Sequence, residues 1–128
     1  MRLPFTTVRR DLLDIINRSE IPLSASEIFE KYGKKADLST VYRAVKYLET
    51  ESIIEGFTIF CSSHEKMRYY SWAGKNHAHF LHCENCHQFK RFDECFIDSI
   101  QNDIESRYHY KIRRHTLYFT GLCDKCRD

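Results

Sequence analysis

The sequence has few of the residues that interrupt regular structure, and it has no long apolar segment. Only four glycines and two prolines occur among 128 residues, which argues against a disordered or low-complexity chain. No apolar run approaches the roughly 18 residues that a membrane-spanning helix needs. Charged residues interrupt the N-terminal segment, so no signal peptide is expected either. We therefore expect a folded, cytoplasmic protein that has no membrane partner.

The sequence also has little net charge and no motif of an enzyme. Twenty basic and eighteen acidic residues give a net charge of +2, which permits nucleic-acid binding without requiring it. Neither a nucleophile motif nor a glycine-rich phosphate-binding loop is present, so we do not expect an enzyme. Residue types that bind metals are unusually abundant, because the chain has six cysteines and seven histidines.

The first seventy residues have the pattern of three helices followed by a two-stranded hairpin. Ser24 and Glu27 have the spacing of a capping box, and Gly33 offers a left-handed stop for the same helix. The expected helices begin near residues 7, 25 and 38, and the expected strands are 53–60 and 67–72. This order predicts a winged helix-turn-helix DNA-binding domain, residues 1–72, in which the third helix reads the DNA.

A short polar segment, residues 73–76, is the expected hinge, and the sequence pattern changes after it. Strands are expected at 77–83, 88–92 and 110–120, with one amphipathic helix at about 96–107. The second domain, residues 77–128, is therefore a small unit of mixed helix and strand. The fold class of the whole chain is predicted to be α+β.

Two C-x-x-C pairs lie in this second domain. Each tight turn can direct two thiolates at one ion, and two such turns complete the tetrahedral sulfur shell that Zn²⁺ accepts. Disulfides are the alternative, but nothing marks the chain as secreted. We predict one structural Zn²⁺ per chain, bound by Cys83, Cys86, Cys123 and Cys126. The other two cysteines, Cys61 and Cys95, are expected to be free thiols.

These features together resemble the ferric uptake regulator (Fur) family over nearly the whole chain. The most specific parts are Thr-Val-Tyr-Arg at residues 40–43, the spacing of the cysteine pairs, and the segments 115–118 and 121–123. Residues 6–9 resemble the family's Thr-Pro-Gln-Arg opening, although its Pro and Gln are missing. The family consists of dimeric transcriptional repressors that respond to metals or peroxide. The resemblance thus implies a homodimer, a dimerisation role for the second domain, and a palindromic operator in double-stranded DNA.

Members of the family typically bind a regulatory metal between the two domains, and many bind another within the dimerisation domain. Several ligand positions of the interdomain site hold unsuitable residues here, namely Pro22, Tyr70 or Ser71, and Arg91. His64 and Cys61, at the hairpin tip, are candidates for a replacement site. A solvated polar turn is the simpler interpretation of that tip.

The other regulatory site fits the sequence better. Counted from Cys83 without a gap, the residues that match its ligands are His77, His79, Asp98 and His115. Three imidazoles and a carboxylate suit a regulatory divalent metal such as Fe²⁺, Zn²⁺ or Mn²⁺. A one-residue shift of the alignment would move His77 and His79 to the interdomain site, and an unrelated surface pair is a further alternative. Packing or surface roles are expected for His82, His87 and His109.

The third helix carries the expected DNA contacts on the faces opposite its apolar stripe. Hydroxyl groups and arginine can contact phosphates and base edges in a major groove, and an aromatic ring can lie on a thymine methyl. The predicted DNA-binding residues of this helix are Ser39, Thr40, Tyr42, Arg43 and Lys46. Arg9 of the first helix is predicted to contact the DNA backbone beside it.

The predicted function is metal-dependent repression of genes for metal uptake or for metal and oxidative stress. Two alternatives stay open at this point. One is a peroxide-sensing regulator of the same family, and the other is a DNA-binding module that has structural zinc but senses no metal.

Overall fold

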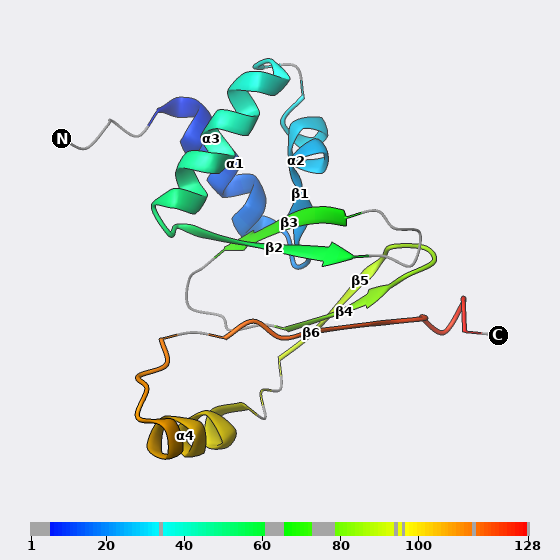
Figure 1. The fold of residues 1–128 in the computed structure, drawn as a ribbon. Coiled ribbons are helices and arrows are strands. Elements are labelled where there is room, and N and C mark those ends of the chain that lie inside the picture. The colour runs from blue at the N-terminus through cyan, green and yellow to red at the C-terminus, as the bar shows by residue number, and fades with distance from the viewer. Residues whose placement is uncertain are drawn as a thin grey trace. The chain divides into compact units, whose positions relative to one another are not determined.

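The computed structural model describes residues 6–33, 35–60, 66–72, 79–93, 95, 97–113 and 115–127. The elements in chain order are α1 Thr7–Arg18, β1 Leu23–Ser24, α2 Ala25–Tyr32, α3 Leu38–Thr50, β2 Ile54–Phe60, β3 Lys66–Trp72, β4 His79–Cys83, β5 Phe89–Phe92, α4 Ile97–Tyr108 and β6 Tyr118–Gly121 (Figure 1). The chain divides into two compact units, Met1–Asn76 and His77–Asp128. No helix among the described residues is long and apolar enough to cross a membrane.

Three helices and a three-stranded sheet form the first unit, which confirms the predicted α+β class and winged-helix arrangement. The predicted capping box of α2 is confirmed, because Ser24 Oγ accepts from the Glu27 N–H at 3.2 Å and Glu27 Oε1 accepts from the Ser24 N–H at 3.0 Å. Gly33 follows α2 with φ of 75° and ψ of −159°, and glycine adopts such a positive φ without strain. Asp37 caps α3 by accepting from the Thr40 N–H at 2.8 Å.

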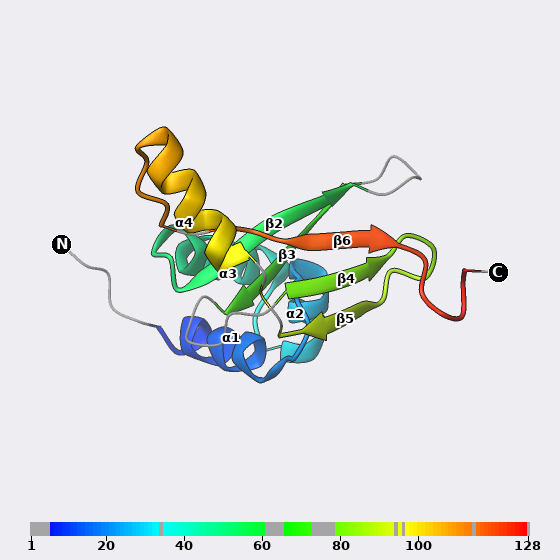
Figure 2. The same ribbon diagram turned by 90° about the horizontal axis from the view of Figure 1, so that it is seen from below.

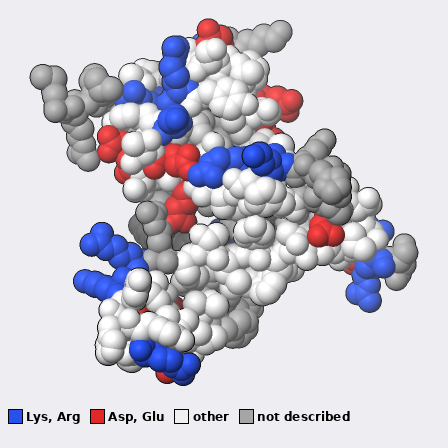
Figure 3. Space-filling model, viewed as in Figure 1, with Lys and Arg blue, Asp and Glu red and all other residues white. Residues whose placement is uncertain are grey.

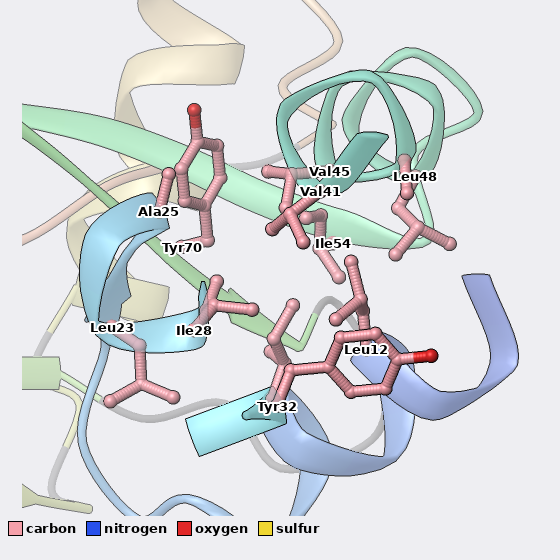
Figure 4. Close-up of a cluster of buried hydrophobic side chains, with 12 residues drawn as sticks. Leu12, Leu23, Ala25, Ile28, Tyr32, Val41, Val45, Leu48, Ile54 and Tyr70 are labelled. Atoms are coloured by element: carbon pink, nitrogen blue, oxygen red, sulfur yellow. The ribbon is translucent and has the colours of Figure 1, made fainter. Parts of the chain in front are cut away.

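The hydrophobic core of the first unit lies where the three helices meet β2 and β3. Side chains from α1, α2 and α3 point toward one another there, together with Ile54 of β2 (Figure 4). The cluster comprises Leu12, Ile16, Leu23, Ala25, Ile28, Tyr32, Val41, Ala44, Val45, Leu48, Ile54 and Tyr70. Because α3 buries one face in this cluster, the unit holds its opposite face at the surface.

The sheet of the first unit has the order β1-β3-β2. β2 and β3 form the predicted hairpin, called the wing below, with antiparallel register from Ile54↔Trp72 to Phe60↔Lys66. β1 was not among the expected strands. Its two residues pair with β3 at Leu23↔Tyr70, and so short a segment has no alternation by which a sequence pattern could reveal it.

A second three-stranded sheet, with the order β5-β4-β6, forms the centre of the second unit (Figure 2). β4 pairs with β5 antiparallel and with β6 parallel. The expected strand at 110–120 was too long, because the structure begins β6 only at Tyr118. The Ile112 N–H donates instead to Glu105 Oε2 at 2.8 Å, which ties this segment to α4.

Several sequence-based predictions fall on residues outside the described ranges. They concern the hinge at 73–76, the proposed ligand His77, and the hairpin-tip pair Cys61 and His64. These predictions stay predictions.

Candidate metal centres and DNA-reading helix

Four cysteine sulfurs converge at one end of the second sheet. Cys83 ends β4, and the parallel pairing Cys83↔Gly121 brings it beside the segment that follows β6. The four Sγ atoms of Cys83, Cys86, Cys123 and Cys126 all lie within 4.8 Å of one another. Cys86 Sγ and Cys123 Sγ are 3.7 Å apart. Two sulfurs bound to one tetrahedral Zn²⁺ at about 2.3 Å would be about 3.8 Å apart, so this cysteine group fits the ion.

Hydrogen bonds to the sulfurs prepare the cysteine group for a cation. The backbone N–H groups of Cys86 and Cys123 donate to Cys83 Sγ, and they lower the pKa of the Cys83 thiol to about 6. The Gln88 N–H lowers the pKa of Cys86, but hydrogen bonding to Cys83, burial and the other sulfurs together raise it to about 11. The Cys83 thiolate therefore forms more easily than the Cys86 thiolate, and a bound dication would favour both.

A second group of metal-binding side chains lies elsewhere in the same unit. His79 begins β4, Cys95 precedes α4, and His115 lies between α4 and β6. One ligand atom from each of the three lies within 4.8 Å of the others. Cys95 Sγ is 3.5 Å from His115 Nε2, and the His79 and His115 rings stack with centroids 5.4 Å apart. We call these three residues the His79 group.

Neighbouring acceptors orient both imidazoles of the His79 group. His79 Nδ1 lies 3.2 Å from the Leu117 carbonyl oxygen, and His115 Nδ1 lies 3.0 Å from Gln101 Oε1. Since an oxygen acceptor takes a hydrogen bond from a protonated Nδ1, each neutral ring carries its lone pair on Nε2. Metal-binding histidines commonly have this second hydrogen bond, so the rings are prepared for a cation.

The structure brings together some of the predicted regulatory ligands. His79 and His115 lie in one group as expected, whereas Asp98 is exposed in the first turn of α4 and outside that group. Cys95, which was expected to be a free thiol, joins them instead. No local spacing marks Cys95 as a ligand, because its neighbours in the group lie 16 and 20 residues away in the sequence.

The other described histidines have structural surroundings, as expected. His82 is buried and packs against His87 and Phe89, with ring centroids 5.5 and 4.9 Å away. Burial lowers the pKa of His82. His87 and His109 are exposed, and both adopt positive φ, 63° and 60°, next to a turn and a helix end.

The α3 helix presents most of its predicted DNA contacts at the surface. Its buried face consists of Val41, Ala44, Val45 and Leu48. Its other faces expose Ser39, Tyr42, Arg43 and Lys46, and leave Thr40 half-buried. Tyr42 is 47% exposed, which leaves much of its ring available to a base.

Basic and acidic side chains are interspersed on the face shown in Figure 3, in agreement with the small net charge.

Arg9 and the wing are both fastened to α3. The Arg9 guanidinium of α1 lies 3.5 Å from the centroid of the Tyr47 ring, so Arg9 packs on α3. Arg68 of β3 donates to Glu49 of α3 and, at 3.1 Å, to Thr58 of β2. The hydrogen bond to Glu49 raises the pKa of Arg68, so the guanidinium stays charged.

Comparison with known proteins identifies the family of this chain. The family model of the ferric uptake regulator family matches residues 1–120. The chain belongs to this family. The ferric uptake regulation protein of Helicobacter pylori is 26% identical over 123 residues, which cover 94% of this chain and 79% of that relative. The protein of the same name from Staphylococcus epidermidis is 29% identical over 135 residues, covering 97% of this chain and 86% of the relative.

A solved structure of a family member shares the fold of this Fur-family chain. The Helicobacter pylori ferric uptake regulator superposes with a TM-score of 0.78 at 26% identity, covering 98% of this chain and 83% of the other. That protein is described as having three functional metal-binding sites. The present chain is thus a Fur-family regulator, and its two groups of potential metal ligands lie within the second unit.

Proposed function

We propose that this Fur-family protein is a metal-dependent, DNA-binding transcriptional repressor that acts as a homodimer. The observation that carries the proposal is the His79 group, a second set of metal ligands with no residue in common with the four cysteines. A chain that needed only structural zinc would have no use for it. The similar Helicobacter pylori protein, with its three functional metal-binding sites, supports more than one metal per chain here. The target genes would serve metal uptake or metal and oxidative stress.

The four cysteines would hold a structural Zn²⁺. They join the turn after β4 to the turn after β6, which are about 40 residues apart in the sequence. A metal at this position would therefore fix the parallel pairing of the two strands.

The regulatory metal would bind at the His79 group. Its ligands are proposed to be His79 and His115, together with His77 and with either Asp98 or Cys95 from the side of α4. Bound metal would favour the dimer geometry in which both winged helices fit the operator. The metal can do so only if it binds that geometry more tightly than the alternatives.

The exposed face of α3 would read the DNA. Tyr42, Arg43 and Lys46 can reach base edges and phosphates in a major groove, with Ser39 and Thr40 beside them. Arg9, packed on Tyr47, would contact the DNA backbone next to the helix. One copy with a net charge of +2 would bind weakly, so two copies on a palindrome are expected to be needed. Because this target is chromosomal DNA, the protein would act in the cytoplasm.

Exposed apolar side chains of the second unit support a dimer. The described part of α4 buries none of its residues. Ile100 is 52% exposed, and Leu81 and Phe119 on the sheet are 44% and 53% exposed. An amphipathic helix with no fully buried residue gains stability when another surface covers its apolar side chains. A second copy of the same unit would provide that surface.

The test measures DNA binding with and without metal. A gel shift on the protein's own promoter compares wild type, the His79→Ala/His115→Ala variant and the exposed-histidine control His109→Ala. Added metal should raise the affinity of wild type and control by about 5- to 150-fold and leave the double variant unresponsive. Equal, metal-independent binding by all three would refute the sensor and favour the module that has structural zinc alone.

The peroxide-sensing alternative has its own readout. After exposure of the metal-loaded protein to peroxide, mass spectrometry of peptides around His79 and His115 should show no added oxygen on the imidazoles. Oxidation of these rings together with loss of DNA binding would favour the peroxide sensor.

A further inference from the structure

We propose that Cys95 is a thiolate ligand of the regulatory metal, in the place expected for the Asp98 carboxylate, and that it makes the site prefer Zn²⁺ to Mn²⁺. This inference rests on the proposed function, because it assigns the ligand chemistry of the same site. It concerns a residue that the sequence pattern classed as a free thiol.

The position of Cys95 fits a shared ion. Zn²⁺ binds sulfur at about 2.3 Å and imidazole nitrogen at about 2.0–2.1 Å, so tetrahedral geometry separates the two ligand atoms by about 3.5–3.6 Å. Cys95 Sγ lies 3.5 Å from His115 Nε2. The nitrogen involved is the one left with the lone pair when Nδ1 donates to Gln101. The pair therefore already has the spacing that a common metal would impose.

A residue of α4 other than Asp98 contacts the His79 group. Gln101, one turn further along α4, is the residue whose side chain contacts His115, at 3.0 Å. Asp98 is exposed, and among the described residues the His79 group contains no carboxylate. Cys95, by contrast, is only partly exposed and has its sulfur inside the group. The structure thus favours sulfur over oxygen as the anionic ligand.

A thiolate in place of a carboxylate makes the anionic ligand softer and leaves its charge the same. A thiolate and a carboxylate each contribute one negative charge, so the electrostatic attraction for any divalent cation is similar. Thiolates select Zn²⁺ and other soft or borderline ions, whereas carboxylates suit Mn²⁺ and Mg²⁺. Two imidazoles and a thiolate therefore form a set that disfavours Mn²⁺, and Cys95 becomes the residue that determines specificity.

The direct test uses Co²⁺ as a spectroscopic probe of the full-length protein with its structural zinc retained. One added Co²⁺ per chain should produce the near-ultraviolet thiolate-to-cobalt charge-transfer band and strong visible bands of a tetrahedral ion. Cys95→Ser should lose the charge-transfer band. Cys61→Ser, which removes the other cysteine outside the C-x-x-C pairs, and Asp98→Asn should both keep it. Zinc content measured on every sample excludes cobalt in the cysteine group.

Competition between Zn²⁺ and Mn²⁺ tests the proposed preference of the site for Zn²⁺. Cys95→Ser should lower the affinity for Zn²⁺ by at least about tenfold with little effect on Mn²⁺. Cys95→Asp should keep a working site and shift its preference toward Mn²⁺, which also shows that the fold survives a change at this position. A charge-transfer band that persists in Cys95→Ser would overturn the proposal. So would an Asp98→Asn variant that loses as much Zn²⁺ affinity as Cys95→Ser.

Failure of this inference is distinguishable from failure of the proposed function. Sulfur-ligated Co²⁺ that leaves DNA binding unchanged would support Cys95 as a ligand and refute the metal sensor. Metal-responsive DNA binding without a cysteine-dependent band would do the reverse. If zinc-retaining protein binds no second metal, both proposals are wrong.

Discussion

If the four cysteines hold a structural Zn²⁺ as proposed, its removal is expected to unfold the second unit and to leave the first unit folded. The reason is the unequal distribution of buried side chains. The first unit has a core cluster of 12 residues, drawn in Figure 4. In the described part of the second unit, the buried side chains are His79, Phe80, His82 and Cys83, of which Phe80 is the one large apolar residue. A unit with so little apolar core needs a metal or another copy to hold it together.

The stability that the second unit would lose with the metal follows from the energy of zinc binding to such ligands. A structural Zn²⁺ in a zinc-finger peptide contributes about 10–16 kcal/mol at neutral pH. An entire small domain is stable by only about 5–15 kcal/mol. Burial of one phenylalanine side chain stabilises the folded state by about 1.5–3 kcal/mol, which cannot offset the loss of the metal. The zinc-free second unit should therefore be unfolded at 25 °C, while the first unit keeps its own stability.

Two assays follow the two units separately. After chelation, hydrogen exchange should become fast at backbone amides of β4, β5 and β6 and stay slow in α1 and α3. In protein that starts with the structural zinc alone, thiol titration should count six reactive cysteines after chelation, the total in the sequence, in place of Cys61 and Cys95. Re-addition of Zn²⁺ should restore the protection. A chain shown to be free of metal that keeps slow exchange in β4 and β6 would refute this reasoning.

Four further predictions concern the first unit. Arg43→Ala should weaken operator binding by about 1–3 kcal/mol, and Lys46→Ala should reduce the slope of log affinity against log salt by about 1, both measured by titration at several salt concentrations. Ser24→Ala should lower the free energy of unfolding by about 0.5–2 kcal/mol in urea denaturation, because it removes half of the capping box. The hydrogen bond from Thr40 lowers the pKa of Asp37 below its usual 3.8, so Asp37 stabilises α3 above that pH and loses the effect as the pH falls through the lowered value. Wild type should thus be more stable than Asp37→Asn at neutral pH, with the difference shrinking below pH 3.8 in denaturation curves.

Local interactions were predictable from the sequence. The capping box of α2 and the stop at Gly33 depend on residues within one or two turns, so their spacing alone reveals them. The C-x-x-C pairs are similar, because each turn brings its two sulfurs together. The combination of these local features with the helix order was enough to indicate the family.

Long-range contacts determined what the sequence could not show. The sequence predicted a long strand at 110–120, but the hydrogen bond from the Ile112 N–H to Glu105 ties the first part of that segment to α4. Cys95 has no motif around it, and it joins the His79 group only because a sheet and a helix bring distant segments together. Asp98 matched the family's ligand position, yet the helix leaves its side chain exposed.

The parallel pair of β4 and β6 connects the two metal groups without any shared ligand. β4 has His79 at its first residue and Cys83 at its last, about 13 Å apart along the strand. His115 precedes β6 and Cys123 follows it, and the register Phe80↔Tyr118 to Cys83↔Gly121 aligns the corresponding ends. A metal held by the cysteines would fix this register and thereby keep the His79 ring stacked against the His115 ring. Loss of the structural zinc should consequently abolish metal binding at the His79 group, whereas His79→Ala should leave the structural zinc in place.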